Sequence, residues 1–173
     1  MLRFLIFFTV ILILLFTAEL TQPVQNAIIL PWTEALALTS ASLITLFDSN
    51  VAAFGKILHS TTNGFAVSIE AGCNGIEAAI VLIAAIFAFP APWKNRILGI
   101  IAGLLALQSL NIIRVISLFY LGQWNQQAFE WAHLYIWQAL IMLDALIVWL
   151  IWIRMLPTLE SACDAVQSQT IKQ

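Results

Sequence analysis

Long apolar runs separated by short polar stretches form the dominant pattern of the chain. The first run, residues 4–18, follows Arg3 and is short enough to be either a membrane anchor or the core of a signal peptide. Three later runs predict membrane-spanning helices over about residues 73–89, 97–120 and 133–153. The pattern therefore predicts an all-α polytopic membrane protein with about four transmembrane helices.

The segment from Pro31 to Phe47 is only moderately apolar, because Trp32, Glu34 and several hydroxyl side chains interrupt it. Such a pattern favours an interfacial or re-entrant helix over a full crossing. A full crossing would require either an external amino terminus or an inverted orientation of the three later helices.

A small β-hairpin is predicted just before the second span. Apolar residues alternate with small or polar ones over residues 65–70, and Asn63-Gly64 supplies the residues that a tight turn prefers. We expect residues 56–60 to pair with residues 65–70 on the outer face of the membrane. The second strand then leads directly to Cys73.

The composition supports a membrane protein: 62% of the residues are hydrophobic and 9% are charged, against about 25% charged in soluble domains. The length of 173 residues predicts one integral membrane domain, residues 1–156, followed by a polar cytoplasmic tail, residues 157–173. A net charge of −2 gives no reason to expect a nucleic-acid partner. Cys73 and Cys163 form neither a disulfide framework nor a paired-cysteine metal spacing, so we expect no metal and no cofactor.

The positions of the cations predict the orientation of the spans, because short cytoplasmic loops collect Lys and Arg. Lys94 and Arg96 follow the second span, and Arg154 ends the last one. These ends are expected to face the cytoplasm. The opposite ends then face outward, and the cation-free loop "LGQWNQQAFEWA" joins the third and fourth spans.

A thiol lies at the predicted outer end of the second span. A cysteine in an apolar helix is usually inert packing, but Cys73 is bracketed by Gly72 and Gly75, which allow close backbone approach. If Cys73 opens the helix, the amino-terminal helix dipole lowers the pKa of its thiol. We therefore interpret Cys73 as a candidate nucleophile.

Arg114 lies in the third span, about six residues inside its outer end at Tyr120. A buried guanidinium costs about 2.5–3.5 kcal/mol at the helix centre on insertion scales, which makes it a functional candidate. Gln108 and Asn111 lie on the same helix face as Arg114. Polar residues at such positions can also serve only to hydrogen-bond neighbouring helices. The structural alternatives for Arg114 are a snorkelling cation and an ion pair with Glu77. We expect a shared role, in which Glu77 pairs with the guanidinium and orients it, and one edge of the guanidinium is left for substrate.

His133 begins the fourth span within a belt of Trp and Tyr residues, which would also explain it as an interfacial histidine. Beside a thiol and a buried arginine it becomes a candidate proton carrier. His59 is expected at the surface of the first hairpin strand. Asp144 lies about 16 Å deeper than His133 by helical rise, so it cannot be its hydrogen-bond partner.

Cys73, Arg114 and His133 together permit acyl transfer. The thiolate attacks a carbonyl, the imidazole moves the proton to the leaving amine, and the guanidinium stabilises the oxyanion or orients the scissile carbonyl. The candidate supporting or substrate-binding residues are Asn74, Glu77, Asn111 and Trp137.

Three stretches, "EAGCNGIEA", "NIIRVISLFYLGQWN" and "FEWAHLYIWQALIMLD", carry a family resemblance. Their Cys, Arg and His, in this order on successive outward helix ends, resemble the exosortase and archaeosortase membrane transpeptidases, most closely the short exosortase H subgroup. The resemblance covers about residues 2–154 and is strongest from Gly64 onward. The chain departs from larger members of the family in having fewer spans.

The resemblance implies catalytic roles for Cys73, Arg114 and His133. It also implies a multi-pass protein of the bacterial inner membrane with its active site at the periplasmic face. The implied substrates are exported proteins with a carboxy-terminal sorting signal, made of an Ile-Pro-Thr-Leu motif, one transmembrane helix and a basic cluster. Cleavage would leave a thioester for an amine or another acceptor, whose identity the sequence does not contain.

Two other functions fit parts of the sequence. An intramembrane thiol hydrolase would use the same residues with water as the acceptor. A small membrane transporter or assembly subunit would use Arg114 and Asp144 to line a path. That function requires internal repeats and helices broken near mid-membrane, whereas the chain has no repeat and its helix-breaking residues cluster at the ends of the spans.

Overall fold

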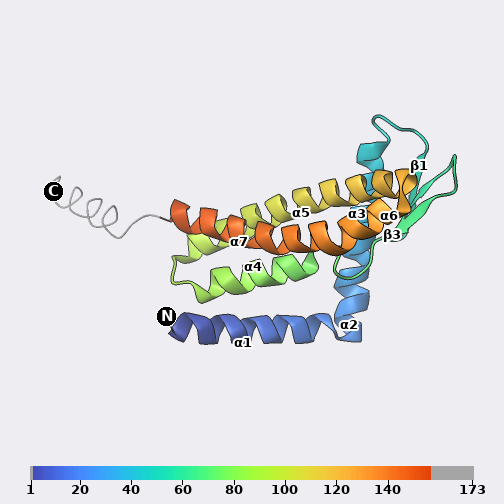
Figure 1. The fold of residues 1–173 in the computed structure, drawn as a ribbon. Coiled ribbons are helices and arrows are strands. Elements are labelled where there is room, and N and C mark those ends of the chain that lie inside the picture. The colour runs from blue at the N-terminus through green and yellow to red at the C-terminus, as the bar shows by residue number, and fades with distance from the viewer. Residues whose placement is uncertain (1, 157–173) are drawn as a thin grey trace, which may run out of the picture.

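A computed structural model describes residues 2–156, and the predicted cytoplasmic tail, residues 157–173, lies outside the described residues. The helices are α1 (Leu2–Glu19), α2 (Gln22–Val24), α3 (Leu30–Ile44), α4 (Ile76–Ala88), α5 (Trp93–Trp124), α6 (Gln126–Trp131) and α7 (Trp137–Met155). Two π-helical turns, η1 (Gln25–Ile29) and η2 (Ala132–Ile136), join α2 to α3 and α6 to α7. Helices α1, α4, α5 and α7 run side by side, whereas α3 lies across one end of this bundle (Figure 1). The fold is that of an all-α polytopic membrane protein with a small sheet.

Four of the described helical segments are long and apolar enough to cross a membrane: residues 2–19, 22–44, 93–124 and 126–155. This set differs from the predicted one. The segment 22–44 qualifies by length and composition, but its main part, α3, is oriented across the bundle (Figure 1), as expected for an interfacial helix. The predicted span 73–89 contains a helix of only 13 residues, α4. At 1.5 Å per residue α4 is about 20 Å long, so the chain before it is recessed relative to the ends of α5 and α7.

A three-stranded antiparallel sheet lies at the end of the bundle that α3 crosses (Figure 1). Strand β2 (Ile57–Ser60) pairs with β3 (Ala66–Ser68), with Leu58 opposite Val67, which confirms the predicted hairpin. Gly64 in its turn adopts φ +71°, which glycine tolerates best. Strand β1 (Val51–Phe54), which pairs with the other edge of β2, was not predicted.

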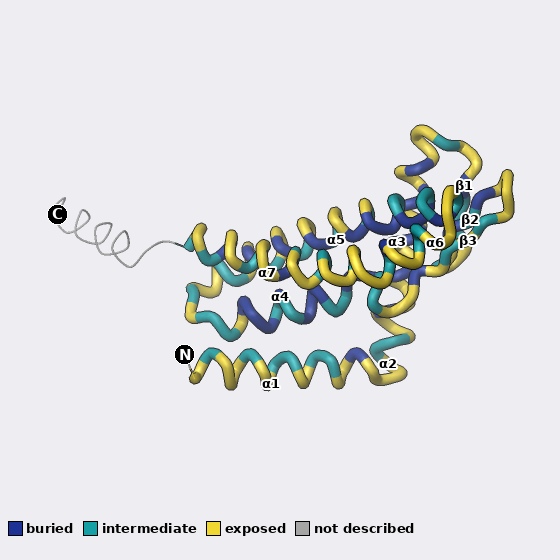
Figure 2. The backbone as a smooth tube through the Cα atoms, viewed as in Figure 1, coloured by how far each residue is buried: buried dark blue, intermediate teal, exposed yellow. Residues whose placement is uncertain are grey.

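Burial is concentrated where the elements meet. One group of buried apolar residues joins α3, the sheet and the end of α5, with Ile44, Leu58 and Phe119 fully buried. A second joins α4, α5 and α7. Much of the outward surface of the long helices is exposed, and α1 carries almost no buried residue (Figure 2). Because these exposed side chains are largely apolar, they are suited to contact lipid.

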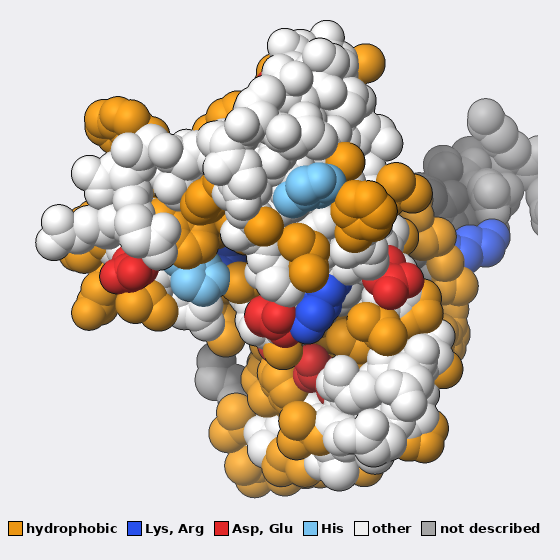
Figure 3. All heavy atoms as spheres, turned by 90° about the vertical axis from the view of Figure 1, so that its right-hand side faces the viewer, with side chains coloured by type: hydrophobic (Ala, Val, Ile, Leu, Met, Phe, Trp, Pro, Cys, Tyr) orange, Lys and Arg blue, Asp and Glu red, His pale blue; other side chains and the backbone are white. Residues whose placement is uncertain are grey.

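The two ends of the bundle differ in charge. Arg3, Lys94, Arg96 and Arg154 lie at the end that holds the start of α1, the connection between α4 and α5, and the end of α7 (Figure 1). The end that carries the sheet shows acidic side chains and histidine together with some Lys or Arg atoms (Figure 3), and one of its cations, Lys56, is paired with Glu70. The cations that predicted the orientation therefore share one end of the molecule.

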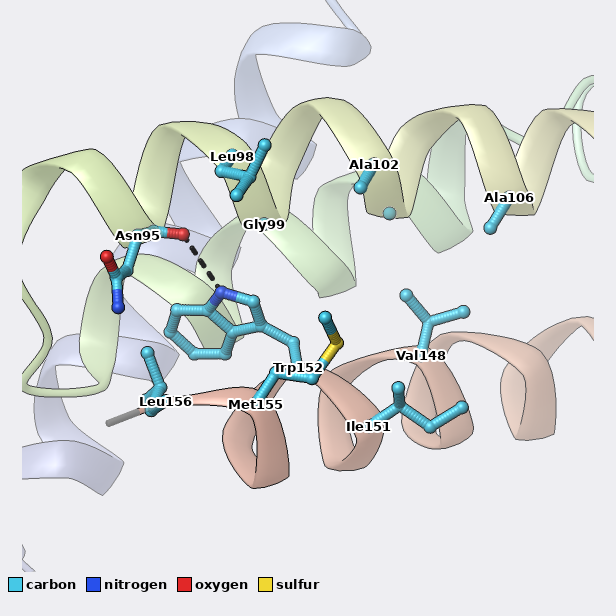
Figure 4. Close-up of a pocket in the computed structure, with 11 residues that line it drawn as sticks. Asn95, Leu98, Gly99, Ala102, Ala106, Val148, Ile151, Trp152, Met155 and Leu156 are labelled. Carbon is cyan, nitrogen blue, oxygen red and sulfur yellow. Dashed lines mark hydrogen bonds between the residues drawn. The ribbon is translucent and has the colours of Figure 1, made fainter. Parts of the chain in front are cut away.

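Helices α5 and α7 pack closely near the cationic end. The indole of Trp152 lies against Gly99, where a Cβ atom would overlap it, and its Nε1 donates a hydrogen bond to the main-chain oxygen of Asn95 at 3.0 Å (Figure 4). An apolar groove of about 410 Å³ runs beside this contact. The close approach that glycine permits is a common device of membrane helix pairs.

Candidate active site

Residues 71–75 form a loop between β3 and α4, and the thiol of Cys73 lies in it. Gly72 and Gly75 adopt φ +84° and +74°, which a helix cannot accommodate, so α4 begins only at Ile76. The expectation that Cys73 opens the helix is therefore wrong. The glycines instead fold the chain into a loop that presents the thiol beside α5.

Several hydrogen bonds hold this loop in place. The main-chain N–H of Gly72 donates to Glu77 Oε1 at 2.5 Å, and that of Ile76 donates to Asn74 Oδ1 at 3.1 Å. Trp32 Nε1 of α3 donates to the main-chain oxygen of Asn74 at 3.2 Å. Gln108 Nε2 of α5 donates to the main-chain oxygen of Gly75 at 3.4 Å. Helices α3, α4 and α5 thus all fix the position of the thiol.

The structure brings Cys73, Arg114 and His133 together. Arg114 Nη2 donates to Cys73 Sγ at 3.4 Å, and its Nη1 donates to the main-chain oxygen of Gly72 at 3.2 Å. The ring nitrogens Nδ1 and Nε2 of His133 lie 3.7 and 3.8 Å from Cys73 Sγ. A small rotation of the imidazole would therefore bring either nitrogen to the thiol proton.

Arg114 is almost fully buried, at 2% exposure, yet no carboxylate of residues 2–156 forms a salt bridge with it. The one salt bridge within these residues joins Lys56 and Glu70. The predicted ion pair between Arg114 and Glu77 is therefore wrong. That prediction assumed a helix running through Cys73. In the structure Glu77 Oε1 accepts the hydrogen bond from the Gly72 N–H, and Oε2 is buried without a hydrogen-bond partner among the described residues.

The thiol is not activated by a helix dipole. Burial raises the pKa of the Cys73 thiol, the nearby Arg114 charge opposes this rise, and the carboxylates of Glu77 and Glu70 reinforce it. The expected lowering of the pKa is therefore wrong. In this resting arrangement the thiol holds its proton at neutral pH and needs a base to remove it.

His133 lies on the π-helical turn η2, between α6 and α7. Such turns are rare and are often found at functional sites. The predicted loop before His133 is almost entirely helical, because α5 extends to Trp124 and α6 begins at Gln126, after the single residue Asn125. Phe129 of α6 stacks on the imidazole with 6° between the planes, which fixes the ring beside Cys73.

A small cavity of about 90 Å³ lies over the thiol. Strand β3 and the residues after it, α5, α6 and η2 all contribute to its wall. The lining residues are Val67, Ser68, Ile69, Glu70, Cys73, Arg114, Val115, Leu118, Phe129 and His133. Sequence reasoning missed Phe129 and the β3 residues as parts of the site. The spacing of Phe129 four residues before His133 was the available signal for a contact.

The four predicted supporting residues take different positions. Asn74 and Glu77 hold the loop, and neither lines the cavity over the thiol. Asn111 and Trp137 line a second, much smaller cavity of about 10 Å³, whose wall also includes Arg114 and Asp144. Both polar side-chain atoms of Asn111 are buried there with no hydrogen-bond partner in the described part of the chain. Asn111 and Trp137 therefore share a cavity with Arg114 but do not line the cavity over the thiol.

Comparison with known proteins gives one family. The family model described as Transmembrane exosortase (Exosortase_EpsH) matches residues 1–151. No curated protein and no solved structure matches the chain. The match covers most of the chain, including most or all of each helix of the bundle and the three residues that meet at the thiol. The chain therefore belongs to the transmembrane exosortase family.

Proposed function

We propose that the chain is a membrane-embedded cysteine transpeptidase that cleaves the carboxy-terminal sorting signal of exported proteins through a thioester on Cys73. Membership of the transmembrane exosortase family supports a membrane transpeptidase in general. The observation that carries the finer proposal is the placement of Arg114 Nη2 3.4 Å and the His133 ring nitrogens 3.7 and 3.8 Å from the same sulfur atom.

In the first step Cys73 Sγ attacks the carbonyl carbon of the scissile peptide bond. His133 accepts the thiol proton as the carbon–sulfur bond forms, which meets the need created by the raised pKa of the thiol. The carbon–nitrogen bond then breaks, and His133 returns the proton to the leaving amine. The upstream part of the substrate remains as a thioester, and the downstream helix leaves with a new amino terminus.

Arg114 contacts both the nucleophilic sulfur and the main chain of the loop that carries it. Its Nη2 stabilises the thiolate that forms when His133 takes the proton, and a shift toward the attacked carbonyl would let it stabilise the oxyanion. Its Nη1 keeps the Gly72 carbonyl in place. A planar guanidinium with two parallel donors suits this double task better than an ammonium group.

In the second step an acceptor amine attacks the thioester carbon. The carbon–sulfur bond breaks, a new amide forms, and the proton lost by the amine returns through His133 to the sulfur. Water in place of the amine would make the same site a hydrolase. Product analysis with and without an added amine distinguishes these outcomes.

The proposed location is the periplasmic side of a bacterial inner membrane. Arg114 is about 32 Å along α5 from Trp93, and His133 is about 33 Å from Met155, by helical rise. Both distances match the thickness of a bilayer core, about 30 Å. If the cationic end faces the cytoplasm, the thiol therefore lies at the outer boundary of the membrane, where an exported protein emerges.

The proposal is tested by expressing the chain with an exported reporter that ends in an Ile-Pro-Thr-Leu motif, a transmembrane helix and basic residues. Cys73→Ala, Cys73→Ser and His133→Ala should abolish cleavage without reducing the amount of folded protein. Cys163→Ala and His59→Ala are matched controls, since His59 lies on β2 and its Nδ1 contacts the main-chain oxygen of Ala52. Normal cleavage by Cys73→Ala would refute the proposal.

A further inference from the structure

Strand β3 forms one edge of the sheet, and its main-chain groups alternate in direction. Val67 stands opposite Leu58, and the bonds Ser60 N to Phe65 O and Ile69 N to Lys56 O flank this pair. In an antiparallel ladder hydrogen-bonded pairs occur at every second residue. Val67 therefore points its N–H and C=O toward β2, while Ala66 and Ser68 point theirs toward the free edge.

These edge groups are open to a partner. Ala66 and Ser68 are both exposed. Among the described residues, none forms a hydrogen bond with the main-chain nitrogen or oxygen of either one on the side away from β2. An edge of unpaired N–H and C=O groups is a template for another strand, and native proteins usually blunt or cover it. Within residues 2–156, this one is left uncovered.

The free edge runs into the cavity of the thiol. The cavity wall includes Ser68 and Glu70 as well as Cys73 and His133. At about 90 Å³ this cavity is far smaller than the roughly 300–1,000 Å³ of typical ligand pockets. The cavity can hold little more than one side chain, so most of a bound peptide must lie outside it. The β3 edge is the adjoining surface that has free hydrogen-bonding groups.

We propose that the substrate binds as a fourth strand on β3, through the main-chain groups of Ala66 and Ser68, with its scissile bond delivered to Cys73. The occupant is an extended polypeptide segment on the amino-terminal side of the substrate's membrane helix. This inference rests on the proposed function. Strand addition supplies affinity through the main chain, and the cavity selects the side chain next to the scissile bond.

The first test measures the affinity of Cys73→Ala protein in detergent for a synthetic Ile-Pro-Thr-Leu peptide. Ser68→Pro removes the outward N–H without breaking the bonds between β2 and β3. The dissociation constant should rise about tenfold, as expected for one lost hydrogen bond and a misplaced ring. Ala53→Pro is the matched control, because its N–H also points away from β2, on the opposite edge strand, and it should leave the affinity unchanged.

A second test leaves the Cys73→Ala protein otherwise unaltered and methylates single amide nitrogens of the peptide. Proline has no N–H, so it must occupy a position of the added strand whose main-chain nitrogen faces away from β3. The N–H groups of the Ile and the Thr then face β3, and methylating either should weaken binding, whereas methylating the Leu nitrogen should not. Equal effects at all three positions would overturn the proposal even if Ser68→Pro failed to fold.

The outcomes separate the binding mode from the proposed function. Cleavage that depends on Cys73 but ignores both Ser68→Pro and the methylation pattern would overturn strand addition alone. Absence of both binding and cleavage would overturn both proposals. A lower mass of the Ser68→Pro protein in detergent, with unchanged peptide affinity, would show that the edge pairs with a second copy of the chain, and would also overturn the inference.

Discussion

Arg114 donates a hydrogen bond to the thiol of Cys73, with Nη2 and Sγ 3.4 Å apart, and no carboxylate within the described chain forms a salt bridge with that guanidinium. The charge buried at 2% exposure is thus directed at the sulfur and the Gly72 carbonyl. A structural arginine would be expected to pair with a carboxylate, since an unpaired buried charge is costly. This arrangement favours a cation that serves the thiolate.

The alkylation of Cys73 by iodoacetamide should depend on pH in a way that reports this contact. In Cys163→Ala protein, the midpoint of the rate should lie above that of a free cysteine, because burial raises the pKa of the thiol. Arg114→Gln should move the midpoint further upward, because it removes the opposing positive charge. Glu70→Gln should move it downward. A midpoint at or below that of free cysteine in the Arg114→Gln protein would contradict the account.

Replacement of Arg114 should affect turnover more than folding. Arg114→Gln should lower the rate of cleavage by a factor on the order of 10²–10³, the usual effect of losing one oxyanion donor. Arg114→Lys should not restore the rate, because a compact ammonium lacks the rigid planar fork whose two nitrogens reach the sulfur and the Gly72 carbonyl. Cleavage of the reporter and the yield of folded protein, measured together, separate the two effects.

The double variant Glu77→Gln, Arg114→Gln is the control for a structural role. The amide that replaces the Glu77 carboxylate keeps an oxygen that can accept the bond from the Gly72 N–H. The loop should therefore stay folded, and activity should stay absent. Activity restored by the double variant would show that Arg114 serves only to balance the charge of Glu77.

The two glycines of the thiol loop offer a matched comparison of stability. Both have positive φ, but a Cβ atom on Gly72 meets nothing within 4 Å, whereas one on Gly75 meets Gln108 Nε2 at 2.9 Å and Asn111 Nδ2 at 3.1 Å. Gly72→Ala should cost about 1–2 kcal/mol for its backbone conformation. Gly75→Ala should cost more, because it also displaces the Gln108 amide from the Gly75 carbonyl. Thermal unfolding in detergent measures both, and equal losses would argue against this packing.

The orientation is tested by labelling single cysteines in intact cells with an impermeant maleimide. In a Cys73→Ala, Cys163→Ala background, Gln127→Cys at the sheet end should be labelled, because this position is exposed in α6. Pro92→Cys, beside Lys94 at the cationic end, should react only after the membrane is opened. The reverse result would place the thiol in the cytoplasm and exclude exported proteins as substrates.

The sequence predicted the parts of the site that depend on regular periodicity. Arg114 and His133 were expected on the same side of the membrane because both lie near the ends of their spans that are opposite the cations. The hairpin was expected because its turn residues and its alternation agree. Both kinds of signal depend on residues that lie close together along the chain, so they can be detected in a single sequence.

The parts that were missed depend on non-local packing or on short elements. Strand β1, "VAAF", has no clear alternation and gains its partners only from β2 and α3. Helix α6 was interpreted as part of the cation-free loop between the third and fourth spans. The chain forms a loop at Cys73 because Gly72 and Gly75 adopt positive φ values. The sequence analysis expected a helix there, and this error led to the wrong predictions about the thiol pKa and about the contact of Glu77.

Isolation of the acyl-enzyme tests the role of Cys73 as the nucleophile. Purified protein is mixed with the sorting-signal substrate in the absence of an amine acceptor, quenched in acid and analysed by mass spectrometry. We expect an adduct on the Cys73 peptide with the mass of the upstream substrate fragment. Hydroxylamine should remove this adduct, and the Cys73→Ala protein should lack it. Cleavage that continues in Cys73→Ala protein, or an adduct on any other residue, would contradict that role.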